Sequence, residues 1–300
     1  MRYRLIQREQ GTSPVTVLCQ VLQVSRSGYY GFGNRARVGR ESGPDSAVLA
    51  DVRRLHRESR RTYGQRRLCE ALRAEGYAVG RWRTRTWMRQ AGVSVRRTRP
   101  WVPRTTDSRH ALPVAPNLLN RQFAVAAPNR VWGSDITYLP TQEGWLYLAI
   151  VVDLFSRKVV GWAVAATMEP SLVETALEMA IGRRQPSPGL LHHSDRGSQY
   201  ASQAYQTLLQ RHQMPCSMSR TGNCWDNAVV ERVFGSLKRE GLADHPADTH
   251  ATAKAATIEY FEMFDHSHRR HSTLGYLSPN AFEAQAQQGE RPRQVNGGGI

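Results

Sequence analysis

Three carboxylates lie in sequence contexts that indicate metal-dependent chemistry. Asp135 lies in the middle of an apolar segment, residues 132–138, whose composition is typical of a β-strand. Burying a carboxylate in such a strand is costly unless its charge is compensated, and a metal cation would do so. Asp195 directly follows a second apolar segment, and Glu231 lies in a segment with helical periodicity. Because hard cations such as Mg²⁺ prefer carboxylate oxygens, the three acids are candidate metal ligands; the alternative is a network of salt bridges with arginines.

The elements predicted around these acids alternate between strands and helices. Three neighbouring strands joined by short turns suggest an antiparallel meander, and a helix, a strand, a helix and a strand follow it. The predicted strands span 131–139, 145–152, 159–165, 190–193 and 214–218, and the helices between them span 172–181, ended by Gly182, and 202–212. This order predicts an α/β, ribonuclease H-like fold, a mixed sheet with helices on both faces. The carboxyl ends of the strands form the ligand crevice of such a sheet, which would place Asp195 near Asp135.

The segment around Glu231 predicts a helix that packs on this sheet. Its buried side is defined by apolar residues at helical spacing, namely Val230, Val233, Phe234 and Leu237. Asp226 or Asn227 is the expected cap of this helix. From such a helix the Glu231 side chain could reach the sheet.

The charge of the chain is divided unequally along the sequence. Residues 1–128 contain 25 Lys and Arg against 8 Asp and Glu, a net charge of +17, whereas residues 129–300 contain 16 against 17, a net charge of −1. All 25 basic residues of the first part are arginines, whose planar guanidinium matches phosphate bidentately. Such an asymmetry predicts a nucleic acid partner, although a solvated basic surface is the simpler alternative.

The basic part is predicted to contain two helical modules. In the first module, a helix is predicted from the helical spacing of Val15, Leu18, Val21 and Leu22. Ser25 is then expected to cap a second, short helix. In the second, a helix over 81–91 carries Arg81, Arg83, Arg85 and Arg89, which would meet DNA on a recognition helix. The predicted N-terminal half consists of a helix-turn-helix-like segment over 1–45, with a linker that begins at Gly33, and a helix-turn-helix domain over 46–98, with helices over 63–74 and 81–91. A proline- and arginine-rich extended linker over 99–128 follows. The remainder is predicted to be a catalytic domain over 129–286 and a disordered tail over 287–300.

Several classes of protein are disfavoured by composition. No apolar stretch of the 300 residues is long enough for a spanning helix, and the first residues lack the apolar core of a secretory signal. The four cysteines are scattered, so neither a disulfide framework nor a Cys-x-x-Cys zinc site is indicated. A cytoplasmic protein is therefore expected.

Several motifs resemble one bacterial family. Exactly 35 residues separate Asp195 from Glu231, and the surrounding segments, residues 193–200, 217–228 and 270–279, closely resemble the B-frame transposase of the insertion-sequence-three family, within the retroviral-integrase-like DDE superfamily. Residues 61–64, Arg-Thr-Tyr-Gly, and the basic helices after them resemble the helix-turn-helix segment of that family. The resemblance extends over nearly the whole chain.

The resemblance implies a DDE transposase that cleaves and joins DNA strands with two Mg²⁺ (or Mn²⁺) ions per active site. It implies that Asp135, Asp195 and Glu231 are the catalytic metal ligands. Lys238, two helical turns beyond Glu231, would hold a DNA phosphate. The other candidate DNA contacts are all arginines: Arg66, Arg67, Arg81, Arg83, Arg85, Arg89, Arg269 and Arg270.

The resemblance also implies the partners of the protein. These are double-stranded DNA at the element ends and the target, further copies of the chain on DNA, and an upstream-frame helix-turn-helix protein or its frameshift fusion. The expected location is the bacterial cytoplasm, at the nucleoid when the protein acts, without a membrane partner.

The chain departs from the family at a few positions. Asp265-His266 replaces the usual Tyr-Asn, Thr221 stands where a basic residue is common, and Gly133 stands where a larger side chain is usual. These departures put local packing and DNA contacts in doubt rather than the reaction.

Other polar groups near the predicted site admit structural roles. His192 and His193 lack partners at zinc-binding spacing, Asp153 ends a predicted strand, and Asn223, Trp225 and Asn227 are expected to shape the loop before the Glu231 helix. Two other functions remain open: a sequence-specific DNA-binding regulator with an inactive catalytic domain, and a ribonuclease H-type nuclease that cuts without joining. Tyrosine and serine recombinases are disfavoured because their nucleophile arrangements are not found.

Overall fold

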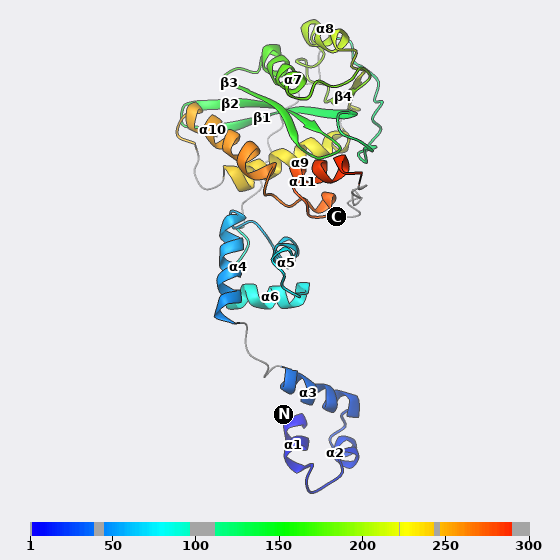
Figure 1. Cartoon of the computed structure of the whole chain (residues 1–300), viewed down its shortest axis with the longest axis vertical. Helices are drawn as coiled ribbons and strands as arrows, with labels where there is room; N and C mark the ends of the chain where they lie inside the picture. The colour runs from blue at the N-terminus through cyan, green and yellow to red at the C-terminus, as the bar shows by residue number, and fades with distance from the viewer. Residues whose placement is uncertain (1, 39–44, 97–111, 222, 243–246, 290–300) are drawn as a thin grey trace.

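The computed structural model describes residues 2–38, 45–96, 112–221, 223–242 and 247–289. Along the chain it contains a small helical cluster, a three-helix module and a larger α/β domain (Figure 1). The predicted tail beyond Gly289 and the first part of the predicted 99–128 linker lie outside the described residues.

The N-terminal cluster consists of α1 (Arg2–Glu9), α2 (Val15–Val21) and α3 (Arg26–Val38), which pack around Ile6, Cys19 and Tyr29. The Ser25 Oγ accepts a hydrogen bond from the Gly28 N–H at 3.0 Å, as a helix cap does. The predicted linker was wrong over residues 33–38, because α3 continues through them; a glycine inside a helix costs only about 1 kcal/mol and need not end the helix. Residues 39–44 lie outside the described part.

The second module consists of α4 (Ser46–Glu58), α5 (Gln65–Ala74) and α6 (Arg81–Gln90). Its core contains Val52, Leu68, Leu72 and Met88, one or two from each helix. The predicted helix over 63–74 begins two residues later than expected. Gly64 takes the cap position, and the chain before it turns through Arg60 and Arg61, both with positive φ.

A five-stranded mixed sheet forms the centre of the α/β domain. The strands are β1 (Val131–Thr141), β2 (Gly144–Asp153), β3 (Val159–Ala165), β4 (Leu191–Ser194) and β5 (Cys216–Met218), in the spatial order β3-β2-β1-β4-β5. The first three strands are antiparallel, whereas β4 is parallel to β1 and β5 is parallel to β4. The predicted ribonuclease H-like fold is confirmed.

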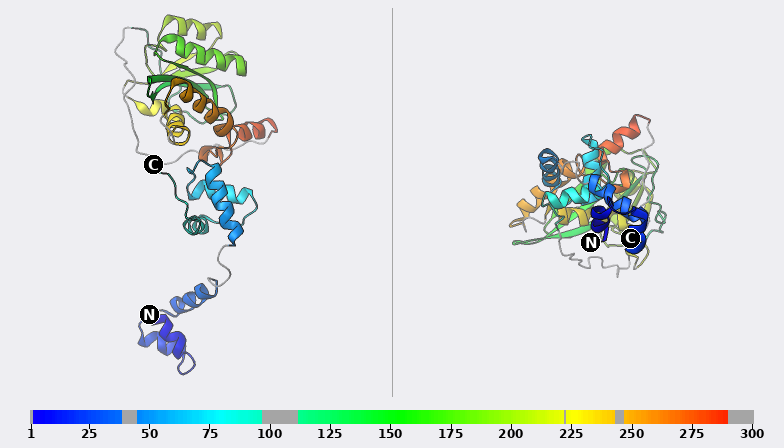
Figure 2. Two further views of the ribbon diagram at one scale, coloured as in Figure 1. Left: turned by 90° about the vertical axis from the view of Figure 1, so that its left-hand side faces the viewer. Right: turned by 90° about the horizontal axis from the view of Figure 1, so that it is seen from below.

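Helices cover both faces of the sheet (Figures 1 and 2). On one face lie α7 (Pro170–Arg184) and α8 (Gln203–Arg211). On the other lie α9 (Ala228–Ser236), the π-helical turn η2 (Leu237–Gly241), α10 (His250–Ile258) and the π-helical segment η3 (Glu259–Asp265). The chain then forms the short turn η4 (Ser272–Leu274) and α11 (Pro279–Gln287).

The predicted end of α7 at Gly182 was wrong. The helix continues to Arg184 and ends where Gln185 adopts a left-handed conformation with φ of 43°. An isolated glycine lowers helix propensity without terminating a helix whose apolar face is buried, so the tertiary packing of α7 decides its length.

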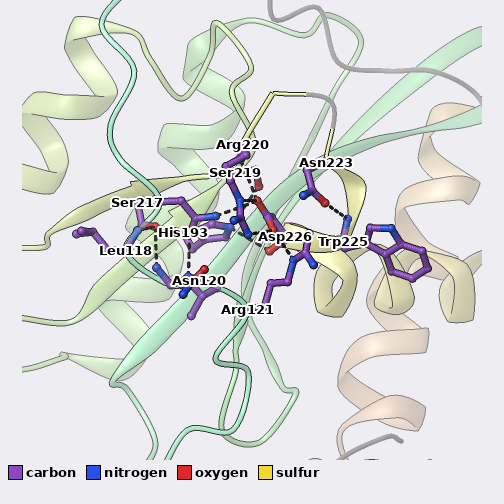
Figure 3. Close-up of polar contacts among 12 residues, drawn as sticks. Leu118, Asn120, Arg121, His193, Ser217, Ser219, Arg220, Asn223, Trp225 and Asp226 are labelled. Atoms are coloured by element: carbon purple, nitrogen blue, oxygen red, sulfur yellow. Dashed lines mark hydrogen bonds and ion pairs between the residues drawn. The ribbon is translucent and has the colours of Figure 1, made fainter. Parts of the chain in front are cut away.

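Residues 112–128 contain no helix or strand, and residues 116–119 of this segment pack against β5 at the edge of the sheet. The Leu118 and Leu119 N–H groups donate to the Ser217 Oγ at 2.9 and 3.2 Å. The Asn117 amide and the Arg121 guanidinium donate to the Asp226 carboxylate at 2.9 and 2.8 Å (Figure 3). This half of the predicted linker is therefore bound to the α/β domain. Within the described ranges, no helix has the length and apolar character required to cross a bilayer.

Two glycines, one on β3 facing α7 and one inside α7, allow a matched test of the packing between this helix and the sheet. A Cβ at Gly161 on β3 would lie 2.1 Å from the Ala176 carbonyl oxygen of α7, whereas a Cβ at Gly182 meets nothing within 4 Å. We expect Gly161→Ala to lower the free energy of unfolding by about 1–3 kcal/mol or more, because overpacking displaces the helix backbone. Gly182→Ala should raise it by about 0.5–1 kcal/mol. Urea unfolding of both variants would measure this, and equal stabilities would contradict the packing described.

The buried carboxylate of Asp226 should make stability depend on pH. Hydrogen bonds from Arg220 and Arg121 hold the pKa of Asp226 well below its usual range. A depressed folded-state pKa stabilises the fold above the unfolded value of about 3.9, and this stabilisation is lost as the pH falls through the folded value. We expect Asp226→Asn to lower the free energy of unfolding by about 1–3 kcal/mol near pH 6.5, since the guanidinium partners of Asp226 are about half exposed. Below about pH 4 the difference in stability between the variant and the wild type should shrink. Urea unfolding at both pH values, with the exposed Asp248→Asn as control, measures this; a difference that does not change with pH would contradict it.

Candidate active site

Asp135 lies on β1, on the side of the strand that faces α9. Its neighbour on that side, Gly133, has no side chain, and a Cβ there would lie 2.8 Å from the Val230 Cγ2 of α9. The glycine therefore allows α9 to lie close against the strand. The Asp135 carboxylate is half-buried, and its Oδ1 accepts the Ile136 N–H at 2.8 Å.

Asp195 follows β4 directly, beside β1. The parallel register pairs Trp132 with His192 and Gly133 with His193. Two further residues along each strand bring Asp195 alongside Asp135, and neighbouring strands are about 4.8 Å apart. The Asp195 Oδ1 accepts the Gly197 N–H at 2.9 Å, which holds the carboxylate in the turn that follows the strand.

Glu231 extends from α9 over the same region. Four residues of this helix, Val230, Val233, Phe234 and Leu237, form its buried side as predicted, while Glu231 itself is exposed. Although the residue is exposed, the surrounding protein removes part of the hydration of its carboxyl, and this desolvation raises the pKa of Glu231. The negative charge of Glu231 contributes to the raised pKa of Asp135, so α9 places the third acid within electrostatic range of β1.

Negative charge accumulates around Asp135. Burial raises the pKa of Asp135 well above its usual value, the Asp195 charge raises it further, and the Glu231 charge adds to this. Three like charges brought together disfavour the ionised state of the most buried one. A cation at this position would relieve the repulsion.

Lys238 supplies one positive charge near the acids. It lies in the turn η2, directly after α9, and its Nζ donates to the Thr137 Oγ1 of β1 at 2.8 Å. The ammonium also lies 5.6 Å from the centre of the Tyr138 ring. Burial lowers the pKa of Lys238, and the Asp135 charge opposes that shift.

His192 and His193 have structural partners. The His192 Nε2 lies 2.8 Å from the Ser134 Oγ and 2.9 Å from the Tyr205 hydroxyl, in the core. The His193 ring lies between the Ser217 Oγ at 2.9 Å and the Asp226 carbonyl oxygen at 3.1 Å. Burial lowers the pKa of His192 to about 3 and that of His193 to about 4, so both rings are neutral at pH 7. Asp153 is likewise structural, because its carboxylate accepts the Asn129 and Phe155 N–H groups at 2.8 and 2.9 Å.

The loop before α9 differs from the expected cap. Neither Asp226 nor Asn227 caps the helix with its side chain: Asp226 is bound to arginines, and the Asn227 Nδ2 donates to the Ser134 carbonyl oxygen at 3.2 Å. A 3₁₀ turn, η1 (Cys224–Asn227), precedes the helix, and the Asn223 Oδ1 accepts the Trp225 N–H at 3.2 Å. Figure 3 shows the Trp225 ring directed away from the Asp226 cluster. The prediction that Asn223 and Asn227 shape this loop agrees with these bonds.

The candidate DNA-contact arginines fall into two groups. Five are exposed, all on α5 or α6: Arg66, Arg81, Arg83, Arg85 and Arg89. The others make contacts within the protein. Arg269 is 5% exposed and donates to Glu240 at 2.6 Å, Arg67 lies 3.5 Å from Glu240, and the Arg270 backbone N–H donates to the Tyr63 hydroxyl at 2.6 Å. Arg67 and Arg269 are therefore engaged in intramolecular ion pairs.

Glu240 was not singled out from the sequence. It follows Leu237 by three residues, so the apolar stripe of α9, continued by one turn, would have indicated its burial. Its two guanidinium partners, Arg67 and Arg269, are distant in sequence and leave no local signal.

The sequence matches families that correspond to the two larger units of the structure. Integrase core domain families match residues 125–224 and 212–279, and an HTH-like domain family matches residues 44–101. These ranges contain the acids on β1, after β4 and on α9, and the helices α4 to α6.

Distant structural neighbours are retroviral integrases. A chain of the simian T-cell lymphotropic virus intasome in complex with PP2A regulatory subunit B56 gamma aligns with a TM-score of 0.44 at 19% identity, over 77% of this chain and 73% of that chain. The HTLV-2 integrase catalytic core domain in complex with magnesium aligns with a TM-score of 0.41 at 19% identity, over 52% of this chain and 97% of that chain.

Much nearer relatives cover almost the whole chain. "Insertion element IS600 uncharacterized 31 kDa protein" of Shigella sonnei is 42% identical over 265 residues, which are 88% of this chain and 97% of that protein. "Transposase InsF for insertion sequence IS3A" of Escherichia coli (strain K12) is 40% identical over 288 residues, which are 94% of this chain and 98% of that protein. The chain belongs to the IS3 family of transposases and is a DDE-type polynucleotidyl transferase of DNA transposition and integration.

Proposed function

We propose that Asp135, Asp195 and Glu231 are the catalytic carboxylates and that they bind two divalent cations, Mg²⁺ or Mn²⁺. The observation that carries this proposal is the continued register of β1 and β4, which brings Asp195 beside Asp135 on the sheet face covered by α9. An all-carboxylate donor set suits hard cations, and the raised pKa of Asp135 reflects charge that such cations would compensate.

The third ligand must approach the other two when cations bind. No three His, Cys, Asp or Glu side chains within the described ranges have the geometry of a preformed metal site, and Glu231 is exposed. A glutamate on the first turn of a helix reaches different positions by changing rotamer, whereas both aspartates are fixed by backbone N–H groups. We infer that Glu231 moves toward the aspartates and completes the site.

The chain itself orients the reacting DNA. When bound, the cations activate the attacking oxygen and stabilise the leaving oxygen of the phosphodiester. The aspartates fix the site on rigid strands, and Lys238 holds a phosphate beside Asp135 by exchanging its bond to Thr137 for one to the DNA. No protein nucleophile is needed, because water and then the freed 3′ hydroxyl are the attacking groups.

The helix α6 is the proposed DNA-reading element. Arg81, Arg83, Arg85 and Arg89 are exposed on it and, among the described residues, form no ion pair with an acid; Trp82 is 79% exposed beside them. Arg66 on α5 and the half-buried Arg270 are the remaining candidate DNA contacts. A short helix with this charge suits the phosphates and base edges of a duplex.

The assembly of the working enzyme is also part of the proposal. Moving an element requires both of its ends to be cut and joined to a target, so we expect several copies of the chain on the DNA. The family resemblance adds an upstream-frame helix-turn-helix protein or its frameshift fusion as partner, acting in the bacterial cytoplasm at the nucleoid.

Neutralising the acids tests the proposed metal ligands. We expect Asp135→Asn, Asp195→Asn and Glu231→Gln each to lower strand cleavage and joining about a thousandfold, since the cations stabilise the transition state by several kcal/mol. Terminal-repeat DNA with Mg²⁺ or Mn²⁺ is the substrate, and chelation with EDTA should have the same effect. DNA binding should persist, and the exposed Glu178→Gln on α7 is the matched control.

The same assay separates the alternatives. Tight binding of the element end without metal-dependent cleavage by the wild-type protein would favour the regulator. Cleavage of an RNA–DNA hybrid without joining would favour the nuclease.

The arginines of α6 should contribute to affinity through phosphate contacts. We expect Arg85→Ala and Arg89→Ala each to weaken binding of terminal-repeat DNA and to reduce the slope of log affinity against log salt concentration by about 1, because each phosphate contact releases about one counterion. Fluorescence anisotropy at several salt concentrations measures both quantities. Arg211→Ala on α8 removes the same charge from a distant surface and should leave the slope unchanged; an equal loss in that variant would contradict a specific role for α6.

A further inference from the structure

The three-helix module is attached to the catalytic domain by two arginines and a tyrosine. The Arg60 guanidinium pairs with Glu259, and its centre lies 4.6 Å from the Phe264 ring centre. The Arg67 guanidinium lies 3.5 Å from the Glu240 carboxylate, and the Tyr63 hydroxyl accepts the Arg270 N–H at 2.6 Å. Figure 1 shows the carboxyl end of α4 facing the catalytic domain.

Glu240 is at the centre of this contact and is buried. It is 7% exposed and accepts hydrogen bonds from the Arg269 guanidinium at 2.6 and 3.1 Å and from the Tyr260 hydroxyl at 3.1 Å. Arg60 donates to the Glu240 carbonyl oxygen at 3.4 Å, so the three-helix module holds both the side chain and the backbone of this residue.

The catalytic domain alone leaves this buried cluster with an excess negative charge. Its acids are Glu240 and Asp265, and its one buried guanidinium is Arg269, which lies 3.7 Å from Asp265 and 2.8 Å from the Ser236 Oγ. His271 is 3.3 Å from Asp265, but burial lowers the pKa of its ring, so it does not supply a full charge near pH 7. Arg67, from the other module, brings the charges into balance, and an uncompensated buried charge is strongly destabilising.

The helical stretch that receives these contacts also carries the catalytic groups. Glu240 lies in η2 with Lys238, and η2 continues α9, which carries Glu231. A π-helical turn is an uncommon element that is frequent at functional sites. The contact from Arg67 therefore lies two residues from Lys238 along the chain.

We propose that Arg67 and Arg60 are positioning residues that lock the DNA-reading module onto the Glu240 turn, so that binding of the element end at α6 fixes the helix of Glu231 and Lys238 for catalysis. The proposal rests on the catalytic role proposed above. It gives Arg67 and Arg269 an intramolecular task in place of a DNA contact. The exposed arginines of α6 bind DNA, and Arg60 and Arg67, at the contact with the catalytic domain, transmit its position to the acids.

A charge exchange at the surface of the contact tests this in the full chain. The side chains of Arg60 and Glu259 are 21% and 54% exposed, so Arg60→Glu and Glu259→Arg disturb the contact without entering the core. We expect Arg60→Glu, Glu259→Arg and Arg67→Ala each to lower the rate at which a pre-cleaved terminal-repeat end is joined about tenfold at saturating DNA. The reason is that small displacements of reacting groups lower reaction rates by that factor or more. The affinity for that end should change less than about threefold, and the double exchange should restore joining to within about threefold of wild type.

The controls separate this proposal from the catalytic one. Arg57→Ala removes an exposed charge from the same module and should behave as wild type. The lock would be overturned if the Arg67→Ala and Arg60→Glu variants joined saturating DNA at the wild-type rate. It would also be overturned if the double exchange joined DNA no faster than the single variants. An inactive wild type, or an active Asp135→Asn, would overturn the catalytic assignment instead. In that case hydrogen exchange still decides the lock: residues 236–241 should exchange at least threefold faster in Arg67→Ala than in wild type, and equal exchange would overturn it.

Discussion

The placement of the Asp135 and Asp195 carboxylates side by side at adjacent strands is the constraint on which the rest of the structure depends. Carboxylates do not gather unless a scaffold holds them, and here the ladder between β1 and β4 and the packing of α9 do so. Gly133 lets α9 approach the strand more closely than any side chain would permit. Burial of Asp135, together with the neighbouring Asp195 charge, raises the pKa of Asp135. A fold that maintains such a cluster is less stable than it could be, as is common at functional sites, and cation binding would return that stability.

The same physics distributes the arginines between two tasks. A guanidinium in solvent, as on α6, keeps its charge available for a phosphate. A guanidinium beside a buried carboxylate, as Arg269 beside Glu240, compensates a charge that would otherwise be destabilising. Arginine content alone therefore indicates a polyanionic partner without identifying the residues that meet it. The environment of each side chain makes that distinction.

The transposase activity is consistent with this arrangement of modules. In the proposed assignment, DNA recognition belongs to the three-helix module, and chemistry belongs to the α/β domain, whose three proposed acids lie on or directly after β1, β4 and α9. Between them lies the Glu240 turn, where both units meet. Because transposition requires a cut at a defined end, a fixed relation between reading and cutting has direct functional value. The contacts of Tyr63, Arg60 and Arg67 provide a physical basis for such a relation.

The sequence by itself determined the five strands, the helices of the second module, the three acids as candidates and the buried side of α9, because period-two and helical patterns record burial within a single element. Pattern alone misjudged the ends of α3 and α7 and the cap before α9, since Gly33 and Gly182 are tolerated inside packed helices and Asp226 is bound by Arg121 and Arg220. Only the tertiary structure decided that Asp195 lies beside Asp135, that Lys238 contacts Thr137, and that Arg67 and Arg269 share Glu240. These pairings join residues far apart in the chain, and their energies depend on distance and burial, which no local pattern encodes.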